Sequence, residues 1–173
     1  MITNHDIDGD TTRRSGTMSR HGATVSWTRG HAAFVDARYS RVHQWSFDGG
    51  ARVSASASPD VVPVPFSDPA GVDPEEAFVA ALSSCHMLWW LHLAAKRGLV
   101  VNRYEDRAEG VMGEKDGRVR MLRVVLRPRV ELAAGDAAAR ALADELHHAA
   151  HEACFLANSV SCEIVCEPET TAA

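Results

Sequence analysis

The feature that most constrains this fold is a long apolar segment between Asp73 and Arg97. Asp73 is a favourable N-cap residue, Pro74 suits the first helical position, and Lys96 followed by Gly98 is typical of a helix end. Between these signals the sequence AFVAALSSCHMLWWLHLAA is apolar on nearly every side. A helix of this kind has to be buried almost all round, either in a core or against a second chain.

Alternating apolar and polar residues predict strands on both sides of this helix. Three strands come before it, and a proline-rich loop at 59–71 separates them from it. Further strands and a second helix follow. Because the strands do not alternate strictly with helices, the fold class is α+β. We expect strands at about residues 23–29, 41–47, 51–56, 100–110, 118–132 and 159–167, a turn at 113–117, and the second helix at 136–154.

The chain length of 173 residues suits one domain. Residues 1–18 are polar and show no periodicity, so we expect a disordered N-terminal extension there. The domain itself is expected at 19–168. The polar residues 169–173 are expected to form a tail.

Charge and hydropathy exclude several classes of function. A net charge of −5 argues against nucleic acid as a partner, because phosphate neutralisation needs an excess of basic residues. The polar N-terminus lacks the apolar stretch of a secretory signal, and no uninterrupted apolar run approaches about 18–20 residues. We therefore expect no membrane partner and a cytoplasmic location. In that compartment the four cysteines are core residues, metal ligands or redox thiols rather than a disulfide framework.

Two of the cysteines lie where chemistry is conceivable. Cys85 is in the middle of the apolar helix, beyond the reach of the helix dipole, so a reactive thiolate there needs a cation from elsewhere. Cys154 lies at the end of the second helix, where a thiol can be accessible. Core packing explains both equally well, because free cysteine is among the most buried residue types. The two thiols can meet only if the two helices pack together.

The remaining cysteines and a group of histidines supply the competing interpretations. Cys162 and Cys166 are four residues apart on an expected strand, about 13 Å from each other, and we interpret both as core or strand residues. His147, His151 and Cys154 recur at helical spacing and could form a ridge of metal ligands. No acidic or cysteine-rich partner motif accompanies them, so we expect no metal.

Several motifs resemble the OsmC/Ohr family, the osmotically induced and organic-hydroperoxide-resistance proteins. One is the lead-in Asp-Pro-Glu-Glu-Ala-Phe at 73–78 with Ser-Cys at 84–85. Another is Cys-Phe-Leu-Ala-Asn-Ser-Val at 154–160. The run from Tyr39 to Gly50 also looks like the early strands of an OsmC-like branch. The resemblance spans about residues 22–168.

The resemblance implies an OsmC-like fold with two antiparallel sheet units around long central helices, in an intertwined homodimer. It also implies a cysteine-based peroxidase that reduces organic hydroperoxides, with Cys85 as the attacking thiolate and Cys154 as the resolving thiol. Such proteins need no bound cofactor and are reduced by an external dithiol, of the lipoyl type in the better-known members. An apolar substrate pocket beside Cys85 is expected to include Trp89, one helical turn away, together with Phe78.

The resemblance further assigns an acidic residue and an arginine to the site. Glu75 matches the acidic residue. Ten helical residues rise about 15 Å, so Glu75 cannot touch Cys85 of its own chain in a continuous helix and would serve a shared site. Arg29 and Arg41 are the two candidates for the arginine. The alternatives to a peroxidase are a small-ligand binding protein of the same fold without turnover, and a metal-dependent protein.

Overall fold

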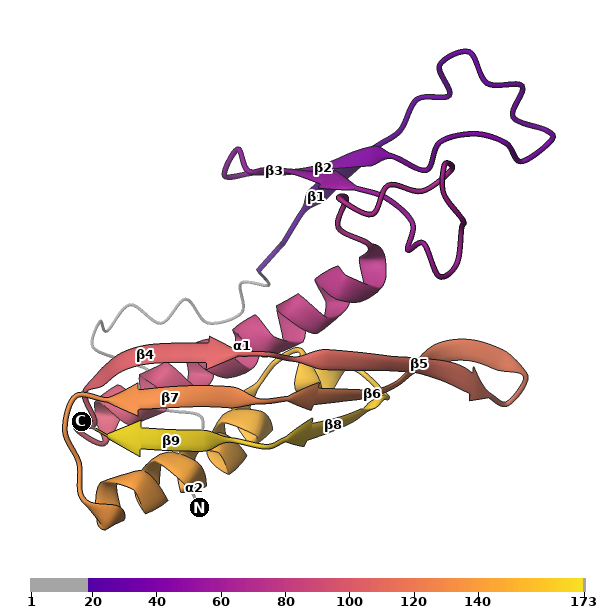
Figure 1. Cartoon of the computed structure of the whole chain (residues 1–173). Helices are drawn as coiled ribbons and strands as arrows, with labels where there is room; N and C mark the ends of the chain where they lie inside the picture. Colours follow the sequence, from indigo (N-terminus) through magenta and orange to yellow (C-terminus); the bar gives the residue numbers. More distant parts are fainter. Residues whose placement is uncertain (1–18, 173) are drawn as a thin grey trace.

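The computed structural model describes residues 19–172, so the extension expected at 1–18 lies outside the described residues. Two long helices and nine strands confirm the α+β class. The strands form a small N-terminal sheet and a longer sheet near the C-terminal half of the chain (Figure 1).

The N-terminal sheet is a three-stranded antiparallel meander of short strands. Strands β1 (Ala23–Ser26), β2 (His43–Phe47) and β3 (Arg52–Ala55) pair in the order β1-β2-β3. Its register places Val25 beside Trp45 and Trp45 beside Val53. The tight turn between β2 and β3 has Gly50 at φ 86°, a conformation that glycine adopts without a Cβ clash.

The longer sheet consists of two three-stranded parts, ordered β4-β7-β9 and β5-β6-β8. Because each part continues directly into the other along the chain, the two form one elongated surface (Figure 1). The strands are β4 (Val101–Asp106), β5 (Glu109–Lys115), β6 (Arg118–Leu126), β7 (Pro128–Leu132), β8 (Glu163–Cys166) and β9 (Glu169–Ala172).

This sheet differs from the sequence-based expectation in three ways. The strands expected at 100–110 and 118–132 are each interrupted, so that four strands form, and β5 continues into the turn expected at 113–117. Strands β8 and β9 run parallel to β6 and β7, so the unit is mixed rather than purely antiparallel. The chain returns through a helical crossover, which leads to parallel pairing. Residues 169–172 are not a tail, because they form β9, which pairs with residues 129–132 of β7. The segment lacks the alternation of apolar and polar residues that predicts a strand, so this pairing could not be predicted from the sequence.

Helix α1 (Pro74–Lys96) follows the expected boundaries closely. Asp73 and Glu76 form a reciprocal capping box, with backbone-to-carboxylate distances of 2.7 and 3.1 Å. The second helix, α2 (Ala137–Ala153), is capped by Asp136 and packs against α1 and β9. The core lies where the two helices meet the long sheet, around Trp90, Leu132, Leu146, Leu82 and Leu126.

By length and composition α1 could cross a membrane, with a mean hydropathy of 1.3 over eighteen residues. Its contacts are nevertheless those of a core helix, because it packs on α2 and on strands β4, β5 and β6. Only 22% of that window is buried within this chain. The unburied apolar face of α1 therefore lacks a partner among the described residues.

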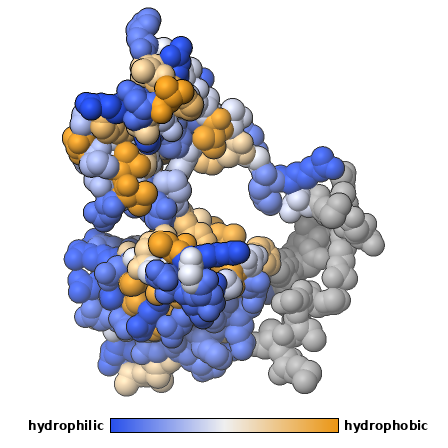
Figure 2. All heavy atoms as spheres, turned by 90° about the vertical axis from the view of Figure 1, so that its right-hand side faces the viewer, coloured by the Kyte–Doolittle hydropathy of each residue, from blue (hydrophilic) through white to orange (hydrophobic). Residues whose placement is uncertain are grey.

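The N-terminal sheet stands at one end of α1, away from the long sheet (Figure 1). Figure 2 shows hydrophobic side chains gathered on this unit and on the body that faces it. Val25, Trp27 and Phe47 are all exposed. The unit is joined to the start of α1 by a bridge between Ala55 and Val72. A sheet with so little buried surface is stabilised poorly by its own chain.

Candidate functional site

Cys85 lies on the outward face of α1, at the edge of an apolar hollow. The hollow has a volume of about 400 Å³ and is lined by Cys85, Leu88, Trp89, His92 and Phe155. The first four residues share one face of α1 because they are spaced at three, four and seven positions. Phe155 reaches the hollow from the segment that follows α2. Leu88 and Phe155 are 62% and 68% exposed, so the hollow is open.

Cys154 approaches Cys85 from the end of α2. Its side chain is 1% exposed, and it lies beside the Cys85 thiol. The Ala157 backbone N–H donates to Cys154 Sγ at 3.4 Å. Burial, followed by the neighbouring Cys85 thiol, raises the pKa of Cys154 to about 11, against the lowering effect of the Ala157 N–H. The structure thus brings together a partly exposed thiol and a buried, protonated one.

The aromatic residues expected near Cys85 separate into two places. Trp89 lines the Cys85 hollow and meets the Phe155 ring edge to face at 5.4 Å. Phe78 instead packs against the core cluster around Leu82 and lines a different hollow, near Cys162. Within one chain, only Trp89 of the two shares a hollow with Cys85. Leu88, His92 and Phe155 were missed, although helical spacing from Cys85 would have found the first two.

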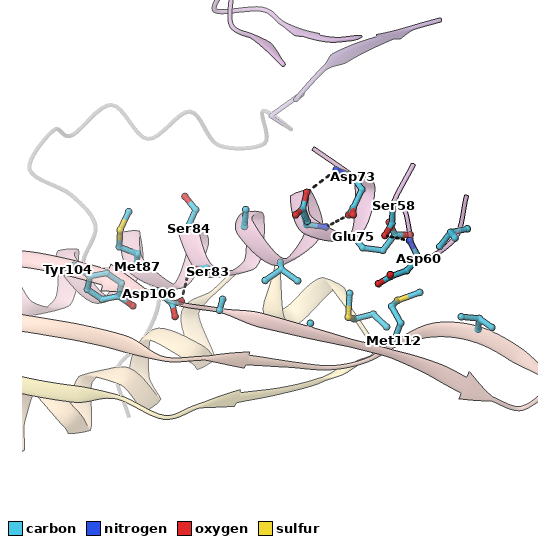
Figure 3. Close-up of a pocket in the computed structure, with 18 residues that line it drawn as sticks. Ser58, Asp60, Asp73, Glu75, Ser83, Ser84, Met87, Tyr104, Asp106 and Met112 are labelled. Atoms are coloured by element: carbon cyan, nitrogen blue, oxygen red, sulfur yellow. Dashed lines mark hydrogen bonds between the residues drawn. The ribbon is translucent and has the colours of Figure 1, made fainter. Parts of the chain in front are cut away.

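Glu75 lies in a larger cavity of about 820 Å³, which does not include Cys85. Figure 3 shows it near the start of α1, with Met112 on the opposite side of the cavity and Ser83 and Asp106 further along it. Because α1 is continuous from Pro74, the rise between Glu75 and Cys85 is about 15 Å. As expected from the sequence, Glu75 cannot serve the Cys85 of its own chain.

Neither candidate arginine contacts Cys85 or Glu75 in the part of the chain that the structure describes. The exposed Arg29 side chain donates to the Ala32 carbonyl at 2.6 Å. Arg41 donates to the carbonyls of Ala37 and Tyr39, and its guanidinium lies 3.7 Å from the centre of the Tyr39 ring. Both arginines belong to the N-terminal unit, which stands away from the middle of α1 (Figure 1).

A second group of reactive side chains lies in the core, next to Cys85 in sequence but on the inward side of α1. His86 of α1, His147 of α2 and Cys166 of β8 form what we call the buried histidine cluster. The sequence offered His147 with His151 and Cys154 only as a competing interpretation, whereas the cluster groups His147 with His86 and Cys166. No sequence spacing could have found it, because its members are 61 and 80 residues apart.

The comparisons with known proteins agree with this fold. A sequence profile described as OsmC-like protein matches residues 67–169. An OsmC-like protein of unknown function from Vibrio cholerae is 51% identical, with a TM-score of 0.84, over 88% of this chain and all of that one. The chain belongs to the OsmC-like family.

More distant relatives of this OsmC-like protein share its fold. An organic hydroperoxide resistance protein from Elizabethkingia anophelis is 16% identical, with a TM-score of 0.64, over 91% of this chain and 99% of that one. OhrB, the organic hydroperoxide resistance protein of Bacillus subtilis, is 18% identical, with a TM-score of 0.58, over 88% and 98%. No curated protein matches the chain. Proteins of the family are generally soluble, consistent with α1 as a core helix.

Proposed function

We propose that this OsmC-like protein is a thiol-dependent peroxidase that reduces organic hydroperoxides. The observation that carries the proposal is the contact between the Cys85 thiol and the Cys154 thiol across two helices, at an open apolar hollow. A partly exposed thiol can meet a peroxide, and the buried neighbour can then resolve the oxidised product. The distant relatives named for organic hydroperoxide resistance support the same chemistry.

The reaction divides into three balanced steps. The Cys85 thiolate attacks the O–O bond of the hydroperoxide, becomes a sulfenic acid, and releases the alcohol after one proton is taken up. The Cys154 thiol then condenses with this sulfenic acid, which forms a disulfide and releases water. An external dithiol reopens the disulfide by exchange and is itself oxidised. A lipoyl-type dithiol meets this requirement, and the protein needs no resident cofactor for any of these steps.

The lining of the hollow favours an apolar peroxide. Its wall carries the side chains of Leu88, Trp89 and Phe155 and almost no polar surface apart from His92. Transfer of an alkyl or aryl group from water onto such a wall is favourable by about 25 cal/mol per Å² of apolar surface. Hydrogen peroxide gains nothing from this contact, so organic hydroperoxides are preferred.

We infer that the complete site forms in a homodimer. The outward face of α1 is apolar but mostly unburied, and the N-terminal sheet exposes apolar side chains that its own chain leaves uncovered. A second copy can cover both surfaces. It can also bring its Glu75, with Arg29 or Arg41, to Cys85, because none of the three reaches Cys85 within one chain. The arginine would then stabilise the Cys85 thiolate.

The test is a single-turnover titration of the reduced full-length protein with cumene hydroperoxide. Free thiols are counted, and any disulfide is located by mass spectrometry. We expect one equivalent of peroxide to consume two thiols per chain and to link Cys85 to Cys154. The Cys85→Ser variant should consume no peroxide, whereas Cys154→Ser should accumulate a sulfenic acid that over-oxidises with excess peroxide.

Cys162→Ser is the matched control, because Cys162 is also a partly exposed free thiol but lies outside the Cys85 hollow. It should turn over like the unaltered protein. Equal peroxide consumption by Cys85→Ser and Cys154→Ser would contradict the assigned roles. Thiols that stay reduced at stoichiometric peroxide would favour a binding protein that uses the same hollow without turnover.

A further inference from the structure

We propose that the buried histidine cluster is a binding site for a divalent transition-metal ion of the zinc class, held by His86, His147 and Cys166. This site is separate from the peroxide site and does not depend on the proposed function. It joins α1, α2 and β8 at the point where both helices meet the long sheet. This set of ligands could not be predicted from sequence spacing, because the three residues come from elements far apart in the chain.

The spacing of the three ligand atoms is close to that of a tetrahedral site. All three lie within 4.8 Å of one another. His86 Nε2 is 3.0 Å from His147 Nδ1 and 3.7 Å from Cys166 Sγ. Bonds of about 2.0–2.1 Å to nitrogen and about 2.3 Å to sulfur, at tetrahedral angles, separate two nitrogens by about 3.3 Å and nitrogen from sulfur by about 3.6 Å. An ion can enter after the two nitrogens part by a few tenths of an ångström and His147 and Cys166, which are up to 4.8 Å apart, draw closer together.

Without an ion, a hydrogen bond joins the two imidazoles, whose planes are parallel to within 4°. This bond uses a proton from one ring only, and other buried polar atoms around it have no hydrogen-bond partner. His86 Nδ1, His147 Nε2 and the Tyr104 hydroxyl are buried without a hydrogen-bond partner among residues 19–172. In each imidazole the unpaired nitrogen is the one opposite the proposed ligand atom, and it would carry the N–H that a metal-bound histidine donates to a water or a neighbouring group.

A transition-metal ion binds neutral imidazole and deprotonated thiolate. The ion therefore replaces the Cys166 thiol proton, so that binding releases one proton to solvent for each metal bound.

Two imidazoles and one thiolate suit zinc and its spectroscopic substitute cobalt better than magnesium or calcium, which require oxygen ligands. The three side chains leave one tetrahedral position for a water molecule. Trp90 stacks on His147 with ring centres 5.1 Å apart, so the surroundings of the cluster are apolar. An ion at this position would tie the two helices to the sheet.

The experiment is a titration of the reduced, chelator-stripped full chain with Co²⁺, carried out in the Cys85→Ser, Cys154→Ser double variant. This background removes the two neighbouring thiols of the Cys85 hollow, which could otherwise bind cobalt themselves. We expect one Co²⁺ per chain, with the visible bands of tetrahedral cobalt and a thiolate-to-cobalt charge-transfer band in the near ultraviolet. Zn²⁺ should displace the cobalt and raise the thermal unfolding midpoint, since it binds the folded state.

Cys166→Ser on the same background should abolish the charge-transfer band and weaken Co²⁺ binding at least about tenfold. Cys162→Ser is its matched control and should change neither. His147→Gln should also weaken binding, and circular dichroism of each variant verifies its fold. The absence of a charge-transfer band in the parent, or a band that survives Cys166→Ser, would overturn the proposal. Failure here leaves the peroxide titration unaffected, because that reaction uses the other two thiols.

Discussion

The two faces of α1 are both apolar, yet only one of them is buried. Leu82, His86, Trp90 and Ala94 recur every four residues and are each no more than 2% exposed. The opposite stripe of Cys85, Leu88, Trp89 and His92 borders an open hollow. Sequence composition treats these faces alike, because both contain aromatic and aliphatic residues. The contacts separate them, because α2 and the long sheet bury the first stripe, whereas the second is only partly covered, by Cys154 and Phe155 at the end of α2.

This difference shows how one helix can support a fold and present a reactive thiol at once. The inward stripe fixes the orientation of α1, and through it the direction in which Cys85 points. The outward stripe then supplies apolar walls that the chain has no structural need to bury. Exposed apolar surface of this kind indicates an interaction site. In our proposal a hydroperoxide and a second subunit share it.

Substitution of the two adjacent tryptophans of α1 tests whether its two faces differ, and it has the largest expected effect on stability. Trp90 is fully buried, and its indole N–H donates to the Ala143 carbonyl at 3.1 Å. Trp90→Ala should therefore lower the free energy of unfolding by about 3–5 kcal/mol. Trp89→Ala, the matched control on the outward face, should cost less stability but weaken the use of bulky hydroperoxides. Urea denaturation and peroxide kinetics measure the two effects, and equal destabilisation would refute the division into two faces.

The same division explains what the sequence could and could not predict. Capping at Asp73 and the length of the apolar run fixed the bounds of α1, because these signals are local. The rise of a helix likewise placed Glu75 out of reach of Cys85. Which face would be covered was not predictable, because near-uniform apolarity leaves no amphipathic stripe.

Elements and contacts that depend on residues far apart in the chain also could not be predicted from the sequence. Strand β9 consists of Glu-Thr-Thr-Ala and exists because it pairs with β7, some forty residues earlier. The meeting of Cys85 with Cys154 rested on the family resemblance, since spacing only permitted it. The contact of His86 with Cys166 had no local signal at all, and His147 was therefore grouped with the wrong neighbours.

A charge on the outward stripe tests whether a second copy covers it, with an intermediate expected effect. Leu88→Asp should weaken the homodimer at least about a hundredfold, or about 2.7 kcal/mol, because an unpaired carboxylate would be buried at the interface. Val100→Asp is the control, since Val100 is equally exposed, at 65% against 62%, but lies in the loop after α1. Sedimentation equilibrium distinguishes them, and a Leu88→Asp dimer as tight as the parent would exclude this face from the interface.

The smallest expected effect concerns the two thiols that meet across the faces of the helices. Alkylation requires the thiolate, and the raised pKa of Cys154, about 11, keeps that thiol protonated at neutral pH. Its burial adds a steric barrier that the partly exposed Cys85 lacks. Cys85 should therefore react with iodoacetamide at least about tenfold faster, a difference of about 1.4 kcal/mol in activation free energy. Peptide mass spectrometry over time measures both rates in one sample.

The Cys85→Ser variant removes the thiol neighbour that helps to raise the pKa of Cys154, so Cys154 should label faster there than in the parent. A Cys154 that labels as fast as Cys85 in the parent would mean that α2 frays at its end, and that the resolving thiol is presented by motion rather than by packing.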